Sequence, residues 1–325
     1  MHSTHPFDAL KPDLILDAVE SLGLRTDGRL LALNSYENRV YQVGIEDGTP
    51  VVAKFYRPQR WSDAAILEEH AFCAALVEAE LPAVPPLVFA GKSLHEHAEF
   101  RFSLFPRRGG RLITIDDAEH RRWIGRLLAR LHGVGARQRF AHRPTLTVAD
   151  FGEASAAFLL EHQVIPAHIE EAYRSLSRDL LQAVGEIMAG IHPALLRIHG
   201  DCHAGNILWT DEGPHFVDFD DARMGPAIQD LWMLLSGERG EQERQLAEVL
   251  EGYEQFRSFD YTEVGLIEAL RTLRLMHYEA WVARRWDDPA FPQAFPWFDS
   301  PRHWEDHVLA LREQLALLHE PPLAP

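Results

Sequence analysis

The residues best suited to chemistry lie in one stretch, His199–Asp221, which reads HGDCHAGNILWTDEGPHFVDFDD. Asp201 follows a glycine, Asn206 comes five residues later, and a group of carboxylates closes the stretch at Asp218, Asp220 and Asp221. Carboxylate and amide oxygens suit Mg²⁺, which usually takes one or two carboxylates from a protein and its other ligands from phosphates and water. A further carboxylate that is not needed for the metal could accept a proton from a nucleophile.

The spacing within this stretch predicts a small hairpin. Two short apolar runs, Ile207–Trp209 and Phe216–Val217, flank a turn that carries Asp211, Glu212 and Gly213. Such runs around a polar, glycine-containing turn are typical of paired strands. The acidic and amide oxygens would then converge at the base of the hairpin.

A lysine and a glutamate far upstream extend the candidate site. Lys54 lies inside an apolar run, VVAKFY, which predicts a strand. A helix follows from the candidate N-cap Ser62 to about Glu80. Its apolar stripe consists of Ile66, Phe72, Cys73, Leu76 and Val77. Glu69 falls within this stripe, whereas Glu68 lies about 100° away toward solvent. A buried carboxylate needs a partner, so we expect a Lys54–Glu69 pair, with Glu68 as the less favoured choice.

The secondary structure that must position these residues changes along the chain, from strands in the first third to helices in the remainder. A first helix is expected over Lys11–Leu22, and Ser35 lies in a polar, glycine-free loop, Asn34–Asn38, which could cover phosphates or simply connect two strands. Five runs rich in apolar and β-branched residues predict a five-stranded antiparallel sheet. These runs are Arg29–Leu33, Arg39–Ile45, Val51–Phe55, Leu87–Ala90 and Phe100–Phe105, with a polar turn at Lys92–Glu99.

A glycine-rich and basic break, Pro106–Arg111, separates this sheet from a mainly helical remainder. The pattern therefore predicts an α+β protein of two lobes, residues 1–105 and residues 106–325. The helices expected in the second lobe are Asp116–Gly133, Ala149–Glu161, Ile165–Gly190, several from Ala227 onward and Trp304–Leu318. The last residues, EPPLAP, are expected to fray.

Composition narrows the class of protein. The chain has 325 residues, of which 46% are hydrophobic, so it is able to bury a sizeable core. Its formal net charge of −17 disfavours nucleic acid or an anionic membrane as the main partner. Two cysteines, Cys73 and Cys202, predict no disulfide framework. The N-terminus does not resemble a signal peptide, and no stretch is apolar enough for a membrane helix. We expect a cytoplasmic monomer.

The order of these features resembles a known family. A strand lysine, a helix glutamate, a linker, HGDCHAGN and VDFDD resemble the aminoglycoside phosphotransferase and choline kinase branch of the protein-kinase-like fold. Within that branch, NSYENRVYQV, AKFYRPQRW, ILEEHAF and FPRRGGR resemble the bacterial stress response kinase A group. The resemblance covers nearly the whole chain. It implies a serine/threonine protein kinase of a stress response, with ATP as co-substrate and Mg²⁺ as cofactor.

The resemblance also implies roles for single residues. Asp201 would be the catalytic base, and Asn206 and Asp218 would hold Mg²⁺, which makes Asp218 part of the catalytic set as well. Lys54 would contact the ATP phosphates, Glu69 would fix Lys54, and the Ser35 loop would cover the phosphates. Phe102–Phe105 would form the hinge beside adenine, with Phe105 at its end, and Asp230 would support the loop around Asp201. The HRD, DFG and APE triplets of ordinary protein kinases are absent.

Alternative interpretations remain open. A small-molecule kinase would phosphorylate an amino-alcohol or an aminoglycoside. Four late tryptophans could then form an aromatic cage for a quaternary ammonium group, although core packing explains them as well (Trp281, Trp286, Trp297 and Trp304). A metal-dependent phosphohydrolase could use His199 and His203. A pseudokinase would bind nucleotide without catalysis. Cys202 is either a redox switch or a small buried residue. Asp220 either recruits a second Mg²⁺ or a cationic acceptor, or it serves as a helix-capping or surface charge. Sequence alone does not name the acceptor.

Overall fold

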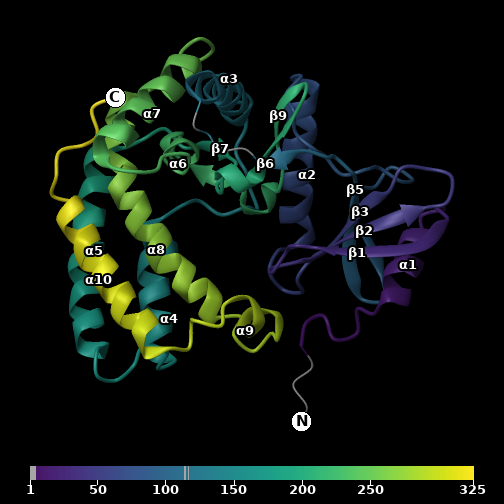
Figure 1. Ribbon diagram of the computed structural model, residues 1–325, viewed down its shortest axis with the longest axis horizontal. Helices are drawn as coiled ribbons and strands as arrows, with labels where there is room; N and C mark the ends of the chain where they lie inside the picture. The colour runs from purple at the N-terminus through teal and green to yellow at the C-terminus, as the bar shows by residue number, and fades with distance from the viewer. Residues whose placement is uncertain (1–4, 113–114, 116) are drawn as a thin grey trace. The chain divides into compact units, whose positions relative to one another are not determined.

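The computed structural model describes residues 5–112, 115 and 117–325. The chain forms two compact units (Figure 1). The first consists of Met1–Thr114, Phe140–Arg143 and His203–Ala222, and the second of Ile115–Arg139, Pro144–Cys202 and Arg223–Pro325. The division of functional lobes after residue 105 stays a prediction. Within the described residues, no helix combines the length and the apolar character that crossing a membrane requires.

The first unit is built on a five-stranded antiparallel sheet in the order β1-β2-β3-β5-β4. The number and pairing of strands confirm the predicted sheet. Its strands are β1 (Thr26–Leu33), β2 (Arg39–Ile45), β3 (Val51–Phe55), β4 (His95–His97) and β5 (Phe100–Pro106).

The position expected for the fourth strand is wrong, since β4 lies at His95–His97 and not at Leu87–Ala90. Phe89 and Lys92 pair with each other across a tight turn, in which Ala90 and Gly91 have φ of 49° and 78°. Strand β4 joins β5 through Ala98 and Glu99, with φ of 46° and 70°. These two residues carry no glycine signal for a turn with positive φ. The sequence His-Glu-His also lacks apolar alternation, so the hairpin was not visible from its residue types.

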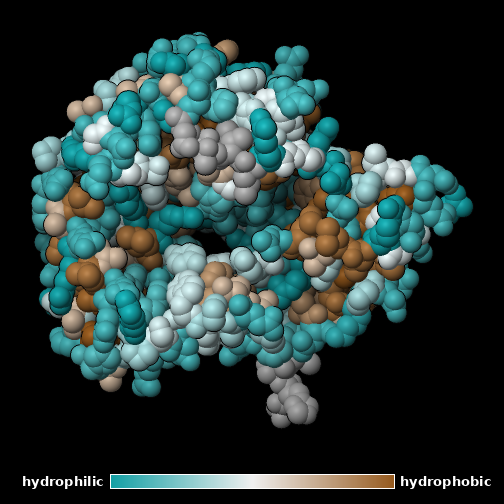
Figure 2. Space-filling view, viewed as in Figure 1, coloured by the Kyte–Doolittle hydropathy of each residue, from teal (hydrophilic) through white to brown (hydrophobic). Residues whose placement is uncertain are grey.

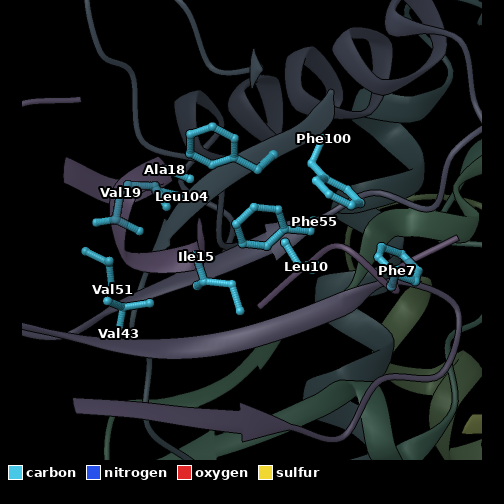
Figure 3. Close-up of a cluster of buried hydrophobic side chains, with 12 residues drawn as sticks. Phe7, Leu10, Ile15, Ala18, Val19, Val43, Val51, Phe55, Phe100 and Leu104 are labelled. Atoms are coloured by element: carbon cyan, nitrogen blue, oxygen red, sulfur yellow. The ribbon is translucent and has the colours of Figure 1, made fainter. Parts of the chain in front are cut away.

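One face of this sheet forms a core with α1 (Pro12–Glu20). Pro12 lies in the first turn of α1, where its missing N–H costs nothing. The buried residues Ile15, Ala18 and Val19 follow helical spacing, and Figure 3 shows them beside side chains of the sheet. Burial of each large aliphatic side chain stabilises such a core by roughly 1.5–3 kcal/mol. The remaining members of the cluster are Phe7, Leu10, Val43, Val51, Ala53, Phe55, Phe100, Phe102 and Leu104.

Helix α2 (Asp63–Glu78) joins separate parts of the chain within the first unit. Ser62 caps the helix by accepting a hydrogen bond from the backbone N–H of Ala65 at 3.2 Å, as its residue type predicts. The ring of Phe72 meets the rings of Phe140 and Phe219 edge-on, with centroids 5.6 and 6.0 Å apart. Helix α2 therefore supports the two segments that return to this unit from later in the chain.

The predicted hairpin is present in the first unit. Strand β8 (Ile207–Thr210) pairs with β9 (Gly213–Phe216), and β6 (Arg111–Leu112) adds a third strand next to β8. Short 3₁₀ turns flank the hairpin, η2 (Ala204–Asn206) before it and η3 (Phe219–Asp221) after it. The backbone N–H of Phe216 donates to the carbonyl of Pro82 at 2.8 Å, which ties the hairpin to the segment behind α2.

The second unit is mainly helical, with β7 (Leu196–Ile198) antiparallel to β10 (Arg223–Gly225). Helices α5, α8 and α10 run side by side (Figure 1). The helix expected from Asp116 is α3, which begins at Ala118 behind the cap Asp117; Asp116 itself lies outside the described residues. The helical segments are α3 (Ala118–Gly135), η1 (Ala149–Glu153), α4 (Ala154–Glu161), α5 (Glu170–Ile191), α6 (Ile228–Trp232), α7 (Arg239–Tyr253), η4 (Tyr261–Leu266), α8 (Ile267–Ala283), α9 (Ala290–Ala294) and α10 (Pro301–Leu317).

The C-terminal tail is held in place, so the expectation that it frays is wrong. Arg239 donates from Nη2 to the carbonyls of Pro321 and Pro322 at 2.9 and 2.7 Å. The N–H of Ala324 donates to Glu243 at 3.2 Å. A proline-rich segment offers free carbonyl acceptors, and α7 supplies the donor.

Hydrophilic residues cover most of the face displayed in Figure 2, in keeping with the net charge of −17.

Candidate active site

The strand register of the first unit places Lys54 on the face of the sheet opposite the α1 core. Lys54 pairs with Val40 of β2 and Ser103 of β5, and Val52 pairs with Phe105. Paired residues share a face, and residues two positions apart along a strand share it as well. Val40, Val52 and Phe105 therefore lie around Lys54 and are each half-buried. An apolar surface beside an ammonium group is suited to an aromatic ring that carries phosphates.

The ammonium group of Lys54 contacts two carboxylates of the hairpin segment. Its Nζ lies 3.0 Å from Oδ1 of Asp220 and 3.3 Å from Oδ1 of Asp218. Burial alone would lower the pKa of Lys54, but the charges of Asp220 and Asp218 outweigh it and hold the pKa well above its usual value. Lys54 is therefore a fixed cation at the base of the hairpin. Residue type and spacing in the sequence mark these three residues as candidates, but only the fold shows that they are in contact.

The direct Lys54–Glu69 pair is wrong for this structure, because Lys54 forms its ion pairs with Asp218 and Asp220. Glu69 is buried at 2% exposure, as its place in the apolar stripe predicts, and its Oε2 accepts no hydrogen bond from the residues that the structure describes. Burial raises the pKa of Glu69, while the charge of Lys54 opposes that rise. The two groups thus interact through space without direct contact. A stripe position reveals that a carboxylate is buried, but not which of several partners it meets.

Glu68 has a different and structural partner. Its carboxylate accepts hydrogen bonds from the backbone N–H groups of Ala141, His142 and Arg143 at 2.7, 2.8 and 3.0 Å. Three charge-assisted hydrogen bonds to one carboxylate are a strong anchor. Glu68 therefore attaches the returning segment Phe140–Arg143 to α2.

We expect Glu69→Gln to reduce phosphoryl-transfer activity more than Glu68→Gln, because of these two glutamates it is Glu69 whose charge acts on Lys54. Glu68→Gln should instead lower thermal stability, since one of its oxygens becomes an NH₂ group that is unable to accept the same hydrogen bonds. Steady-state rates and melting temperatures of the two variants test this division. The opposite order of activity loss would move the functional role to Glu68.

Asn206 and Asp218 lie next to each other at the open end of the hairpin. The backbone N–H of Val217 donates to the carbonyl of Asn206 at 3.0 Å, directly beside the Ile207–Phe216 pair. Asp218 adopts the left-handed conformation with φ of 58°, and its side chain is 60% exposed. The hydrogen bond from Val217 brings the backbone of Asn206 beside the residue before Asp218, and an asparagine amide and a carboxylate are hard oxygen donors that fit Mg²⁺. In the described parts of the chain, no three His, Cys, Asp or Glu side chains form a metal-binding group.

Asp220 is a buried link between cations. It is 4% exposed, and its second oxygen pairs with Arg60, which also contacts Asp221 at 3.0 Å. Burial would raise the pKa of Asp220, but Arg60, Lys54 and Arg143 together hold it well below its usual value. Arg143 also donates to the carbonyl oxygens of Ala222 at 2.5 Å and of Asp220. These contacts favour a structural role for Asp220. Neither Arg60 nor Arg143 was identified from the sequence.

The Asn34–Asn38 loop is anchored at its base. Ser35 donates from Oγ to the carbonyl of Asn38 at 3.2 Å, so this hydroxyl closes the loop on itself. The side chain of Asn38 accepts from the N–H of Arg57 at 3.0 Å, and Arg57 donates from Nε to the carbonyl of Glu37 at 2.9 Å. The contact of Ser35 with phosphates stays a prediction. Phe105 meets the ring of His70 edge-on at 6.4 Å, and its contact with adenine likewise stays a prediction.

In the second unit, Asp230 of α6 holds the backbone before Asp201. Its two carboxylate oxygens accept from the N–H groups of His199 and Gly200, each at 2.8 Å, and Gly200 has a φ of 83° that favours glycine. The predicted support by Asp230 is confirmed. His132 also contacts Asp230, at 3.1 Å. Burial would raise the pKa of Asp230, but the hydrogen bond and charge of His132 outweigh it and lower the pKa.

Asp201 itself contacts an arginine of α8. Arg274 donates from Nη1 to Oδ1 of Asp201 at 2.7 Å, and the two side chains are 41% and 24% exposed. The carboxylate is therefore fixed and remains accessible. Arg274 lies 73 residues away in the sequence, and no motif marks it, so only the fold identifies it.

Two open sequence interpretations gain a structural answer. Cys202 is fully buried, and burial raises the pKa of its thiol well above the usual value, which disfavours the reactive thiolate. Three late tryptophans pack against phenylalanine rings: the ring centroids of Trp286 and Trp304 lie 4.8 and 5.2 Å from that of Phe298, and the centroid of Trp281 lies 5.1 Å from that of Phe291. Trp304 is buried, whereas Trp297 is 40% exposed. Packing therefore accounts for Trp281, Trp286 and Trp304 better than a cage for an ammonium ligand.

The buried Glu263 of η4, which contacts the start of α6, should make the free energy of unfolding depend on pH. Glu263 accepts from the N–H of Ile228 at 2.9 Å, and burial raises its pKa from 4.5 to about 7. Between these values the unfolded chain loses its proton while the folded chain keeps it. This contribution is therefore fully present below pH 4.5 and falls by up to about 3 kcal/mol as the pH rises to 7. Melting curves at pH 5 and 7.5 should show a smaller difference for Glu263→Gln than for the wild type; equal differences would contradict the assignment.

A fixed lysine beside carboxylates in one unit, and an accessible carboxylate on a supported loop in the other, are the parts of a phosphoryl-transferring enzyme. Residues 29–267 match the model of the phosphotransferase enzyme family, and the chain belongs to that family. It is 46% identical over 322 residues to stress response kinase A of Escherichia coli (strain K12), covering 99% of this chain and 98% of that protein. It is also 46% identical over 317 residues to the serine/threonine protein kinase RdoA of Salmonella typhimurium, covering 98% and 96%.

Solved structures share the fold. The amicoumacin kinase hAmiN in complex with AMP-PNP, Ca²⁺ and Ami has a TM-score of 0.71 at 18% identity, covering 94% of this chain and 93% of that one. A microcompartment-associated aminopropanol kinase has a TM-score of 0.69 at 16% identity, covering 93% and 95%. The predicted α+β kinase-like fold, the stress response kinase A resemblance and the assignment as a phosphotransferase are confirmed. Membership of this family argues against the phosphohydrolase interpretation.

Proposed function

We propose that this protein is a serine/threonine protein kinase of a stress response, which transfers the γ-phosphoryl group of ATP to a protein hydroxyl. The observation that carries the proposal is the contact of the buried Lys54 ammonium with Asp218 and Asp220, at 3.3 and 3.0 Å. A cation held at the base of an oxygen-rich hairpin is suited to neutralise phosphate oxygens. Identity over nearly the full length to kinases with these names supports the protein acceptor.

Each candidate residue has one task in this proposal. Lys54 binds phosphate oxygens, Glu69 keeps negative charge near Lys54, and the half-buried Phe105 contacts the base of the nucleotide. The hydroxyl of Ser35 helps to shape the loop that covers the phosphates. The acceptor oxygen forms a bond to the γ-phosphorus as the bond from that phosphorus to the ADP oxygen breaks. Asp201 accepts the hydroxyl proton, so the products are ADP and a phosphorylated protein.

Asn206 and Asp218 would hold Mg²⁺, and their oxygen donors fit this ion. When bound, Mg²⁺ would neutralise negative charge on the phosphates and help to orient them. The chain's own contribution is to keep Asn206 and Asp218 adjacent through the Val217–Asn206 hydrogen bond.

A cytoplasmic location and a monomeric state also belong to the proposal.

A second candidate acceptor is a small molecule. The structural neighbours include kinases whose names specify amicoumacin and aminopropanol. One experiment separates the two acceptors: incubation with γ-labelled ATP, with generic protein substrates in one set of reactions and amino-alcohols or aminoglycosides in the other. Label on serine or threonine, in a substrate or in the enzyme itself, is the expected result. Label on small molecules alone would overturn the protein acceptor.

A further inference from the structure

Arg274 is a cation from α8 that contacts the candidate base directly. We propose that Arg274 positions the carboxylate of Asp201 and, by its permanent charge, favours a peptide-borne hydroxyl over the hydroxyl of a free amino-alcohol. This inference rests on the proposed function and adds a selectivity to it. It starts from the 2.7 Å hydrogen bond between Nη1 of Arg274 and Oδ1 of Asp201.

The backbone on both sides of this contact is fixed within the second unit. Helix α8 is anchored by Thr272, Leu273 and Met276, each no more than 1% exposed. On the other side, Asp230 holds the N–H groups of His199 and Gly200. The remaining freedom of Asp201 lies in its side-chain torsions, and the contact with Arg274 restrains them. A displacement of about 1 Å in a reacting group can cost roughly 10²-fold in rate.

The contact contributes little to folding. The side chain of Arg274 is 41% exposed and that of Asp201 is 24% exposed, and an ion pair with such access to solvent adds little to the stability of a protein. Removal of Arg274 should therefore leave the fold intact. Activity and stability become separable measurements, so a loss of rate in a folded variant reports on the position of Asp201.

The charge of Arg274 has a consequence for the acceptor. A guanidinium group stays protonated in proteins. In an amino-alcohol such as ethanolamine, the ammonium lies one carbon from the carbon that bears the reacting hydroxyl, so it must approach the base together with that hydroxyl. The guanidinium of Arg274 repels an ammonium that is brought this close, and this repulsion offsets the attraction of the ammonium to the Asp201 carboxylate. A serine within a peptide carries a neutral amide at that position and avoids this repulsion.

The test compares a neutral serine peptide with ethanolamine as acceptor, using wild type, Arg274→Ala and Arg274→Lys. Arg271→Ala is the matched control, because Arg271 lies one turn earlier on α8 and pairs with Glu268 at 3.5 Å. We expect Arg274→Ala to lower kcat on the peptide by roughly 10–10²-fold, with KM for ATP and melting temperature unchanged. Arg274→Lys should restore part of kcat, and added guanidinium chloride at millimolar concentration should partly rescue Arg274→Ala. A purely structural role would not respond to added guanidinium.

The ratio of kcat/KM for ethanolamine to that for the peptide should rise at least about 10-fold in Arg274→Ala, which corresponds to ~1.4 kcal/mol, and stay constant in Arg271→Ala. Wild-type kcat and an unchanged ratio in Arg274→Ala would overturn the inference while leaving the kinase function intact. A wild-type enzyme that phosphorylates ethanolamine but no peptide would overturn both the acceptor proposal and the selectivity. A wild-type enzyme that is inactive toward every acceptor would refute the proposed function itself.

Discussion

Replacing Asp201 with alanine should lower kcat by roughly 10²–10⁴-fold, the usual contribution of a general base, with nucleotide affinity unchanged. The structure gives two reasons for a clean effect. Asp230 holds the backbone at His199 and Gly200 independently of the Asp201 side chain, so the loop should keep its shape. Asp201 also belongs to the second unit, whereas Lys54, Asn206 and Asp218 belong to the first. Loss of its carboxylate therefore leaves the candidate nucleotide and metal ligands in place.

The measurement is a steady-state assay of γ-phosphoryl transfer, with nucleotide binding followed by calorimetry on the same preparations. Asp179→Ala is a suitable control, because Asp179 is a half-exposed carboxylate of α5 in the same unit. Asp201→Asn is a second variant that keeps the size of the side chain and its contact with Arg274. Near-wild-type kcat in both Asp201 variants would remove this residue from catalysis.

Local patterns predicted most of the sheet that carries Lys54. Strands β2 and β3 begin and end where alternation of apolar residues placed them, and β5 extends one residue further. In these strands one face is buried against α1, so the two-residue period is written into the residue types. Strand β4 was missed because its turn uses Ala98 and Glu99 in place of glycine. Residue preferences therefore fail where a turn places residues other than glycine at positive φ.

The candidate functional residues also fall into two groups: those that the sequence identifies and those that only the fold identifies. Asn206 and Asp218 could be identified because they lie in the same motif-rich stretch as Asp201, and Asp230 because the family resemblance implies its role. Arg143, which contacts the backbone of Asp220 in the first unit, and Arg274, which contacts Asp201 in the second, could not be identified, because the spacing of their segments carries no signal. Helical periodicity correctly buried Glu69, yet the ion-pair partners of Lys54 came from about 160 residues later in the chain. Periodicity reports which face is buried, but the pairing of buried charges depends on the whole arrangement of the unit.

Asp220→Ala should destabilise the first unit by about 3–5 kcal/mol, the range for removing one member of a buried ion pair. Asp220 is 4% exposed, and its oxygens contact Lys54 and Arg60, whose side chains are 8% and 12% exposed. Without this carboxylate, two cations stay buried with less compensation. Asp218→Ala should behave in the opposite way. The side chain of Asp218 is 60% exposed, so its loss should change stability by no more than ~1 kcal/mol while weakening Mg²⁺-dependent nucleotide binding and activity.

Urea unfolding followed by a probe in the first unit, such as fluorescence of Trp61, measures the first effect. Titration of Mg²⁺ in the presence of nucleotide measures the second. Because the two aspartates lie two residues apart in the same segment, each variant controls for general disturbance by the other. Equal stability of Asp220→Ala and wild type would mean that Arg60 and Lys54 find water or other partners in the folded state. An unchanged metal titration in Asp218→Ala would count against Asp218 as a ligand. The opposite phenotypes follow from accessibility: a carboxylate that solvent reaches is able to bind an ion, whereas a carboxylate enclosed by two cations is already neutralised and serves to hold them.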